Sequence, residues 1–209
     1  MSDSLPDHSR LPASSRRYAF VAIGFISCSM LMYEVLLTRI CALRLLFHFS
    51  FLVISNCLLA IGASGTLLSL VQDRWASRQR HFISLFGLFY LLSLAATYAF
   101  LINVPIRANI NFQNAIEVVW FLIFNLVAAV PFFFAGGVIG MILTFNARRA
   151  NVVYGVDLLG AGAGCLLCPL LLWGFGAGGC LMSLALLGLV GTLVALPPGR
   201  RRPLLVGVG

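Results

Sequence analysis

The sequence predicts an all-α integral membrane protein, a bundle of about six transmembrane helices with both termini in the cytoplasm. Of its 209 residues, 61% are hydrophobic and only 10% are charged, whereas an ordinary soluble domain has roughly 25% charged residues. Several apolar windows reach the roughly 20 residues that a membrane-spanning helix needs. Nearly all the charged residues lie between these windows, so a soluble globular fold is excluded.

The chain divides into a polar tail, a membrane domain and a basic tail. Residues 1–17 hold prolines and several serines, and we expect them to form a disordered cytoplasmic tail. The apolar run that follows has no A-x-A-like cleavage site after it, which favours an uncleaved first helix over a secretory signal. Residues 18–197 are the predicted six-helix transmembrane domain, and residues 198–209 are a basic cytoplasmic tail. The predicted helices cover residues 18–38, 45–71, 82–104, 118–145, 152–173 and 176–196.

The arginines predict the orientation of the helices. All 14 basic residues are arginine, and with 6 acids they give a formal net charge of +8. Basic residues collect on the cytoplasmic side of membrane proteins, and a cytoplasmic N-terminus places most of these arginines there. The net charge is therefore explained by sidedness rather than by nucleic-acid binding. The arginines on the outer side are Arg39, Arg44 and Arg107.

The stretch VVYGVDLLGAGAGCLLCPLL, residues 152–171, has two interpretations. A strand that ends in an acid and is followed by GAGAG is typical of a nucleotide-binding domain, but the helix after such a loop needs a solvated outer face. No charged residue occurs between Asp157 and Arg200, so we expect a membrane helix instead. Glycines four residues apart lie on one helix face and let two backbones approach closely in lipid. The predicted packing glycines are Gly136, Gly140, Gly160 and Gly164, and Gly174 and Gly178 have the same spacing.

Two cysteines of the same stretch, Cys165 and Cys168, form a Cys-x-x-Cys motif. Such a motif could be a disulfide-exchange site or part of a metal site. Both sulfurs are expected near the middle of the helix, away from any aqueous partner, and no His, Asp or Glu accompanies them at that depth. We therefore interpret both cysteines as small apolar filler. We predict no catalytic residue, no metal site and no cofactor.

Two carboxylates inside the predicted spans need a reason, because a charge at the centre of a membrane helix costs about 2.5–3.5 kcal/mol on insertion scales. Glu34 is expected near the outer end of the first helix, where Arg39 or Arg44 would neutralise it. Asp157 is expected near the cytoplasmic end of the fifth helix, either neutralised by the arginines that precede it or lining a cavity. Both acids could be structural or could bind a substrate or ion. We expect them at opposite depths.

Four segments of the chain, in order, carry a family resemblance. LMYEVLLTRICALRLLF begins at Leu31, IGASGTLLSL at Ile61, PFFFAGG at Pro131 and VYGVDLLGAGAGCLL at Val153. They resemble the first membrane motif, the glycine-rich second helix, the fourth-helix motif and the Tyr-x-x-Asp-Leu-x-Gly-Ala signature of the bacterial multi-pass, spermidine-synthase-like proteins. The resemblance spans about residues 18–196. It singles out Tyr33, Glu34, Arg39, Pro131, Gly136, Tyr154, Asp157, Gly160 and Gly164.

The resemblance implies a function because this sequence lacks the catalytic domain that is usual in the family. Members of this family usually continue into a cytoplasmic Rossmann-like domain, similar to polyamine aminopropyltransferases, that supplies the cofactor loop and the catalytic aspartates. This sequence contains neither. We therefore expect a non-catalytic membrane module in the bacterial inner (plasma) membrane that anchors or serves a separately encoded Rossmann-type partner. The ending RRRPLLVGVG resembles the start of a further apolar segment, so a truncated gene and a split two-chain system would both explain it.

Two other classes of function are open to this sequence. The first is a small transporter for a cation or a polyamine-like metabolite, with Glu34, Arg39 and Asp157 as candidate substrate or ion residues. The second is an intramembrane enzyme, which is disfavoured because no nucleophile, base and orienting group cluster in the sequence. The lipid bilayer is the expected partner in each case, a homo-oligomer stays open, and nucleic acid is not expected.

Overall fold

The computed structural model describes residues 13–44, 50–75, 79–103 and 115–195. Within these ranges all the secondary structure is helical, and five helices are long and apolar enough to cross a membrane. This confirms the predicted all-helical class with several apolar spans. Residues 1–12 and 196–209, which include most of the two expected tails, lie outside the described ranges. The elements are α1 (Ala13–Arg44), α2 (Ser50–Trp75), α3 (Gln79–Asn103), α4 (Ala115–Phe145), η3 (Ala147–Arg149) and α5 (Ala150–Ala195).

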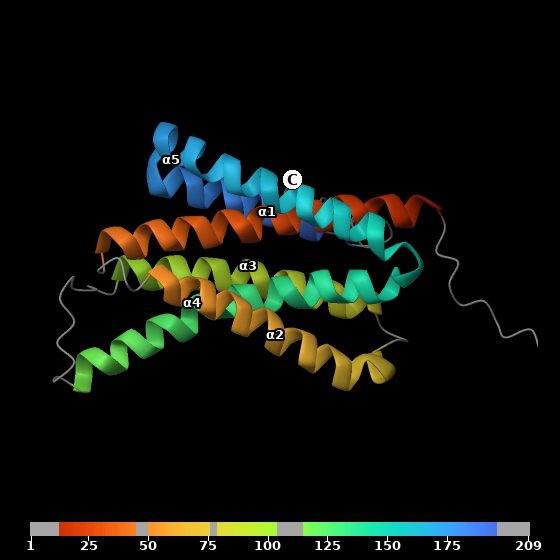
Figure 1. Ribbon diagram of the computed structural model, residues 1–209, viewed down its shortest axis with the longest axis horizontal. Helices are drawn as coiled ribbons and strands as arrows, with labels where there is room; N and C mark the ends of the chain where they lie inside the picture. Colours follow the sequence, from red (N-terminus) through yellow and green to blue (C-terminus); the bar gives the residue numbers. More distant parts are fainter. Residues whose placement is uncertain (1–12, 45–49, 76–78, 104–114, 196–209) are drawn as a thin grey trace, which may run out of the picture.

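The fifth helix is a hairpin. α5 has 46 residues, and Gly176 interrupts it with a non-helical backbone at φ 69° and ψ −175°. Glycine adopts a positive φ without the steric cost that a Cβ brings. The Sγ atoms of Cys168 and Cys180 are 3.6 Å apart, although twelve residues of continuous helix would separate them by about 18 Å. The last two predicted spans, 152–173 and 176–196, therefore form one element that reverses at Gly176, and Figure 1 shows the blue half lying beside the cyan half.

Helix α1 lies at the centre of the molecule. Figure 1 shows it between the α5 hairpin on one side and α2, α3 and α4 on the other. In its most apolar window 61% of the residues are buried, against 28–33% in the other four candidate spans. Many large apolar side chains of those four spans are exposed on the outside of the bundle, where lipid would contact them. Most of the polar contacts between helices therefore involve α1.

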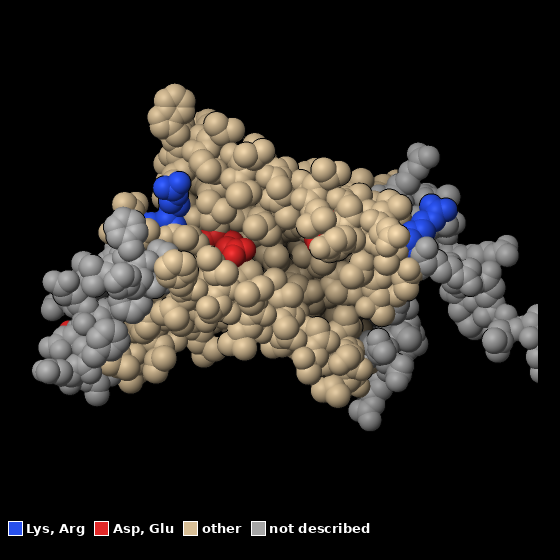
Figure 2. Space-filling view, in the orientation of Figure 1, with Lys and Arg blue, Asp and Glu red and all other residues tan. Residues whose placement is uncertain are grey.

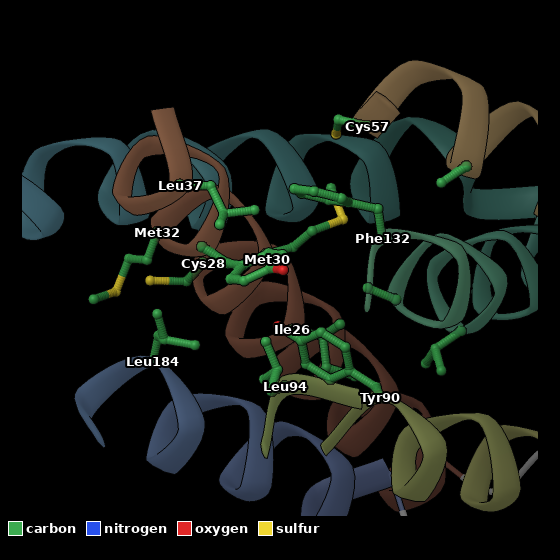
Figure 3. Close-up of a cluster of buried hydrophobic side chains, with 14 of the residues drawn as sticks. Ile26, Cys28, Met30, Met32, Leu37, Cys57, Tyr90, Leu94, Phe132 and Leu184 are labelled. Atoms are coloured by element: carbon green, nitrogen blue, oxygen red, sulfur yellow. The ribbon is translucent and has the colours of Figure 1, made fainter. Parts of the chain in front are cut away.

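The core is formed where side chains of several helices meet α1. In Figure 3, Phe132 of α4 lies on one side of α1, and Tyr90 and Leu94 of α3 and Leu184 of α5 lie on another. Tyr90, Phe132 and Leu184 are fully buried. The ring of Tyr33, on α1, packs against Phe132 with the centroids 5.0 Å apart. Contacts with helices on several sides fix the rotation of α1, and so fix which helix each of its polar residues faces.

The observed ends of α1 differ from the prediction. The helix begins at Ala13 and ends at Arg44, whereas the predicted span is residues 18–38. Its apolar stretch runs from Tyr18 to Leu43. Arg39 therefore belongs to the helix rather than to an outer loop. This extension changes the depth of every residue in the second half of α1, including Glu34.

Candidate functional site

The closest approach in the bundle is between α1 and the first half of α5. A Cβ added to Gly160 would collide with the backbone carbonyl of Gly24, and one added to Gly164 would collide with that of Cys28. The two helices thus touch backbone to backbone, as expected for small residues at four-residue spacing in lipid. The helix also runs without a break through GAGAG, where a nucleotide-binding loop would need a turn.

Asp157 lies within this close approach. The hydroxyl of Ser27, on α1, donates a hydrogen bond to Oδ1 of Asp157. Ser27 is only 1% exposed, and Asp157 is half-buried. Two such short side chains can reach one another only because the flanking glycines bring the backbones together. The contact is therefore a consequence of the glycine spacing.

Glu34 faces a different neighbour, α2. Its Oε2 atom is 3.6 Å from the Sγ atom of Cys57, which donates to it. Cys57 is buried at 3% exposure, and Glu34 is half-buried. A thiol is a weak donor, so it compensates a buried carboxylate only in part.

Glu34 lies on α1, and Asp157, on α5, meets the same stretch of α1 at Ser27. Ser27 follows Tyr18 by nine residues and Glu34 precedes Leu43 by nine, so each is about 14 Å from its end of the span. Ser27 and Glu34 are seven residues apart, which places them on the same face of the helix about 10 Å apart along its axis. Figure 2 shows acidic atoms in the middle part of the molecule, surrounded by residues without charge, with arginines towards the two ends.

The predicted end of the first helix is wrong, because the helix is predicted to end at residue 38 and extends to Arg44. Six additional residues move the end of the helix outward by about 9 Å. Glu34 is consequently about 14 Å from the end of the apolar stretch at Leu43. The expectation that Glu34 and Asp157 lie at opposite depths stays a prediction, since Asp157 is only seven residues from the start of its own span at Ala150.

The expected pairing of Glu34 with Arg39 is also wrong. Among the described side chains no ion pair joins either acid to a basic residue, and Arg39 is exposed. Five residues of α-helix rotate a side chain by about 140°, so Glu34 and Arg39 point to different sides, whereas partners on one face are three or four residues apart. Arg149, at the end of η3 and just before α5, is also exposed. The side chains of the other expected partners, Arg44 and Arg148, lie outside the described residues.

Polar groups from α2 and α4 lie next to the Glu34 end of the site. Nδ2 of Asn56 donates to Oδ1 of Asn125 at 2.8 Å, and Asn56 immediately precedes Cys57. The hydroxyl of Tyr33 donates to the carbonyl of Ala128 at 3.2 Å. These bonds join α2 to α4 and α4 to α1, so they hold the helices around Glu34. Tyr33, one of the residues that the family resemblance singles out, thus has a packing role.

The remaining predicted residues have separate positions. A Cβ on Gly136 would come 2.9 Å from Oγ of Ser64, and one on Gly140 would come 3.2 Å from Cδ2 of Leu68, so both glycines face α2. Gly174 and Gly178 have nothing within 4 Å of an added Cβ, so the packing role expected from their spacing is wrong. Pro131 is buried inside α4, and Tyr154 is 54% exposed near the start of α5.

The cysteines are arranged differently from the Cys-x-x-Cys expectation. Cys165 is exposed on the outside of the bundle, whereas Cys168 is fully buried and contacts Cys180 of the returning half of α5. This pair is not apparent in the sequence, because its two members are separated by the hairpin turn. A signal is nevertheless present, since the predicted spans leave a break between residues 173 and 176. Within the described ranges no group of three or more His, Cys, Asp or Glu side chains could hold a metal ion.

Comparison with known proteins gives no match: no protein-family model, no curated protein and no solved structure matches this chain. The resemblance to spermidine-synthase-like proteins therefore rests on the four sequence segments alone. What the geometry contributes is a pair of half-buried carboxylates inside a bundle of helices that are long and apolar enough to cross a membrane.

Proposed function

We propose that this multi-pass membrane protein binds a cation within the bilayer, at the face of α1 that carries Glu34 and that meets Asp157 through Ser27. The observation that carries the proposal is the position of the two half-buried carboxylates inside candidate membrane spans, without an ion pair to any described basic side chain. A carboxylate at that depth is stable only if a proton or a cation neutralises it. Exchange between the two is the elementary step of cation transport.

The spacing of the two acids supports transport rather than static binding. Glu34 and Ser27, the residue that contacts Asp157, are offset by about 10 Å along α1, so a cation released by one carboxylate is still within the field of the other. A small inorganic cation would occupy them in turn, and a polyamine-like metabolite would contact both with separate ammonium groups. The protein would thus be a small transporter for a cation or a polyamine-like metabolite.

The test is uptake by the chain alone, reconstituted in lipid vesicles. Labelled spermidine and labelled rubidium are the two probes, and Glu34→Gln and Asp157→Asn are the two variants. Each variant removes one charge and keeps the shape of the side chain. Glu117→Gln, in the first turn of α4, is the matched control, because it removes a carboxylate far from the middle of the span.

We expect the wild type to take up at least one probe, both site variants to lose that uptake, and the control to keep it. Loss in only the two site variants cannot come from the net charge, because all three substitutions change it equally. No uptake of either probe by the folded wild type would overturn the proposal. Uptake that survives both substitutions would do the same.

The orientation that we propose is six crossings with both termini in the cytoplasm of a bacterium, across its inner (plasma) membrane. The reversal of α5 at Gly176 and the excess of arginine on one side support it. Single cysteines at Ser77 and Asn111, in a cysteine-free background, test it with a membrane-impermeant label added from outside. Labelling of Ser77→Cys but not of Asn111→Cys would contradict this orientation.

The family resemblance supports a second proposal, a membrane module that anchors or serves a Rossmann-type, aminopropyltransferase-like partner. Arg149 and Tyr154 are exposed at the start of α5, at the end of the bundle where such a partner would dock. Asp157 is poorly placed for docking, because it contacts Ser27 inside the bundle. Co-purification with a co-expressed partner, weakened by Arg149→Ala and unchanged by Asp157→Asn, would support this proposal. The reverse pattern would contradict it.

A further inference from the structure

An apolar groove lies at one end of the bundle, where the turn of α5 meets the last turns of α1 and α3. Its volume is about 280 Å³, and Leu43 of α1, Tyr98 of α3, and Gly178 and Leu181 of α5 are among the residues that line it. Figure 1 shows the turn of α5 and the ends of α1 and α3 at the same end of the molecule. Leu43 and Tyr98 are exposed, so the groove is accessible from outside the bundle.

The groove lies at the level where lipid tails meet head groups. Leu43 and Leu101, which both line it, are the last residues of the candidate spans in α1 and α3. Gly178 is only two residues beyond Gly176, where α5 reverses. Trp173, three residues before that turn, is 92% exposed, and tryptophan and tyrosine are enriched at the surface level of a membrane. A ligand in the groove would therefore have apolar atoms in the hydrocarbon layer and polar atoms at the membrane surface.

Two polar side chains, Arg39 and Tyr98, accompany this apolar lining. Arg39 is exposed and precedes Ile40, which lines the groove. It is also four residues before Leu43, so both lie on the same side of α1, and its long side chain extends towards the membrane surface. Neither the guanidinium of Arg39 nor the hydroxyl of Tyr98 has a hydrogen-bond partner among the described residues. Both can therefore donate to an anion, and a guanidinium forms charge-assisted hydrogen bonds with phosphate oxygens.

A glycine leaves the groove unfilled. Gly178 lines it, and a Cβ added there would have nothing within 4 Å. The volume is a little below the roughly 300–1,000 Å³ of a typical ligand pocket, which suits part of one acyl chain rather than a whole lipid. An apolar groove at this depth, with a cation beside it, is complementary to an amphiphile that has an anionic head group.

We propose that this groove binds one anionic phospholipid, with an acyl chain against Leu43, Gly178 and Leu181 and with phosphate oxygens that accept hydrogen bonds from Arg39 and Tyr98. A zwitterionic lipid with the same chains fits the groove equally well, but its head group carries a compensating cation. The arginine therefore selects for net negative charge. The bound lipid would join the turn of α5 to the ends of α1 and α3. The site is separate from Glu34, which faces α2, so lipid binding does not depend on the proposed cation transport.

The experiment titrates the full chain in detergent with phosphatidylglycerol or with phosphatidylcholine of the same acyl chains, and native mass spectrometry counts the bound lipids. We expect one phosphatidylglycerol per chain, bound about tenfold more tightly than phosphatidylcholine, as expected for a charge-assisted hydrogen bond. Arg39→Gln should abolish this preference. Arg149→Gln, the matched control, removes the same charge about 40 Å away along α5 from the turn and should keep it. Equal affinity of the wild type for the two lipids would overturn the proposal, and so would a preference that survives Arg39→Gln.

A second pair of variants tests the groove separately from the charge. Gly178→Leu places a side chain in the groove, so it should weaken the binding of both lipids. Gly174→Leu is the matched control, because an added Cβ there also has nothing within 4 Å but Gly174 does not line the groove. Equal lipid binding by these two variants would contradict the proposal. Lipid-free dimers that Gly178→Leu dissociates would also contradict it, because a second copy of the chain would then occupy the groove.

A third measurement needs no variant. Phosphatidylglycerol with a photoactivatable group in one acyl chain is cross-linked to the wild type, and the attachment sites are mapped by peptide mass. We expect the peptides that contain Leu43 and Leu181 to be labelled, and excess unlabelled phosphatidylglycerol to suppress the labelling more than phosphatidylcholine does. Labelling spread over the other apolar helices, without enrichment at these two residues, would show that the lipid has no specific site in the groove.

Discussion

The two most extensive helix interfaces are α1 with α5 and α2 with α4. They contain glycines at the same spacing, but the glycines make different contacts in each. At the first, Gly160 and Gly164 lie against the backbone of Gly24 and Cys28. At the second, Gly136 and Gly140 meet mostly side chains of α2. The difference comes from the partner helix, because Gly24 and Cys28 are themselves small and four residues apart, whereas α2 presents Ile61, Ser64 and Leu68. A pair of spaced glycines thus gives a backbone contact only when the opposing helix also has small residues at that spacing.

The width of each interface determines which polar residues can bridge it. Between α1 and α5 the short side chains of Ser27 and Asp157 reach each other. Between α2 and α4 the backbones lie farther apart, and two longer amides, Asn56 and Asn125, make the bridge. The carboxylate of Asp157 is therefore held by the tight interface, while Glu34 lies beside the looser one. Changes that widen or tighten one interface should affect one acid and leave the other in place.

The largest effect is expected from Gly164→Ala. An added Cβ would overlap the carbonyl of Cys28, and because that atom belongs to the backbone the two helices must move apart. We expect a loss of about 1–3 kcal/mol in the free energy of unfolding, measured by SDS titration or thermal unfolding in detergent. Gly162→Ala is the matched control, because an added Cβ there has nothing within 4 Å. Equal stability of the two variants would show that α1 and α5 are not in backbone contact.

The glycine face of α5 can be predicted from the sequence because it depends on spacing and on the absence of charge, which are local properties. The sequence predicts a helix rather than a cofactor loop over residues 152–171, and the helix does run through them. The depth of Glu34 cannot be predicted in the same way, because it depends on where α1 ends. Arg39 suggests an end near residue 38, but an arginine side chain near the end of a span extends towards water while its backbone stays helical.

The pairing of polar residues cannot be predicted from the sequence either, for a second reason. One pair, Ser27 with Asp157, joins two different helices, and the other, Cys168 with Cys180, joins the two halves of one hairpin. The sequence does not show how these segments are aligned with one another. The expected charge pairing, Glu34 with Arg39, uses sequence proximity in place of helical geometry. That geometry alone argues against the pair, because residues five apart on a helix lie on different faces.

An intermediate effect is expected at the Asn56–Asn125 bridge. Replacing each by Leu, singly and together, gives a double-mutant cycle across the α2–α4 interface. Side-chain hydrogen bonds between membrane helices contribute about 0.6 kcal/mol on average and up to about 1.7 kcal/mol, and we expect a coupling energy in that range in the unfolding titration. Asn125 also donates to the carbonyl of Phe121 in its own helix, so its single substitution should be the more costly one. A coupling near zero would mean that the bridge is not formed in the membrane.

The smallest effect is expected from Gly140→Ala, and its contrast with Gly136→Ala, in the same helix and at the same interface, is the sharpest test of the comparison. A Cβ on Gly140 would come 3.2 Å from Cδ2 of Leu68, the far end of a flexible side chain that can rotate away. Alanine also favours the helix over glycine by up to about 1 kcal/mol, so the net change should be within about 0.5 kcal/mol of zero.

A Cβ on Gly136 would come 2.9 Å from Oγ of Ser64 and 3.3 Å from Cα of Ile61. Since a backbone atom cannot rotate away, Gly136→Ala should destabilise the bundle, though by less than Gly164→Ala. If Gly140→Ala instead destabilises as much as Gly164→Ala, α2 and α4 are as tightly packed as α1 and α5, and the distinction between the two interfaces fails.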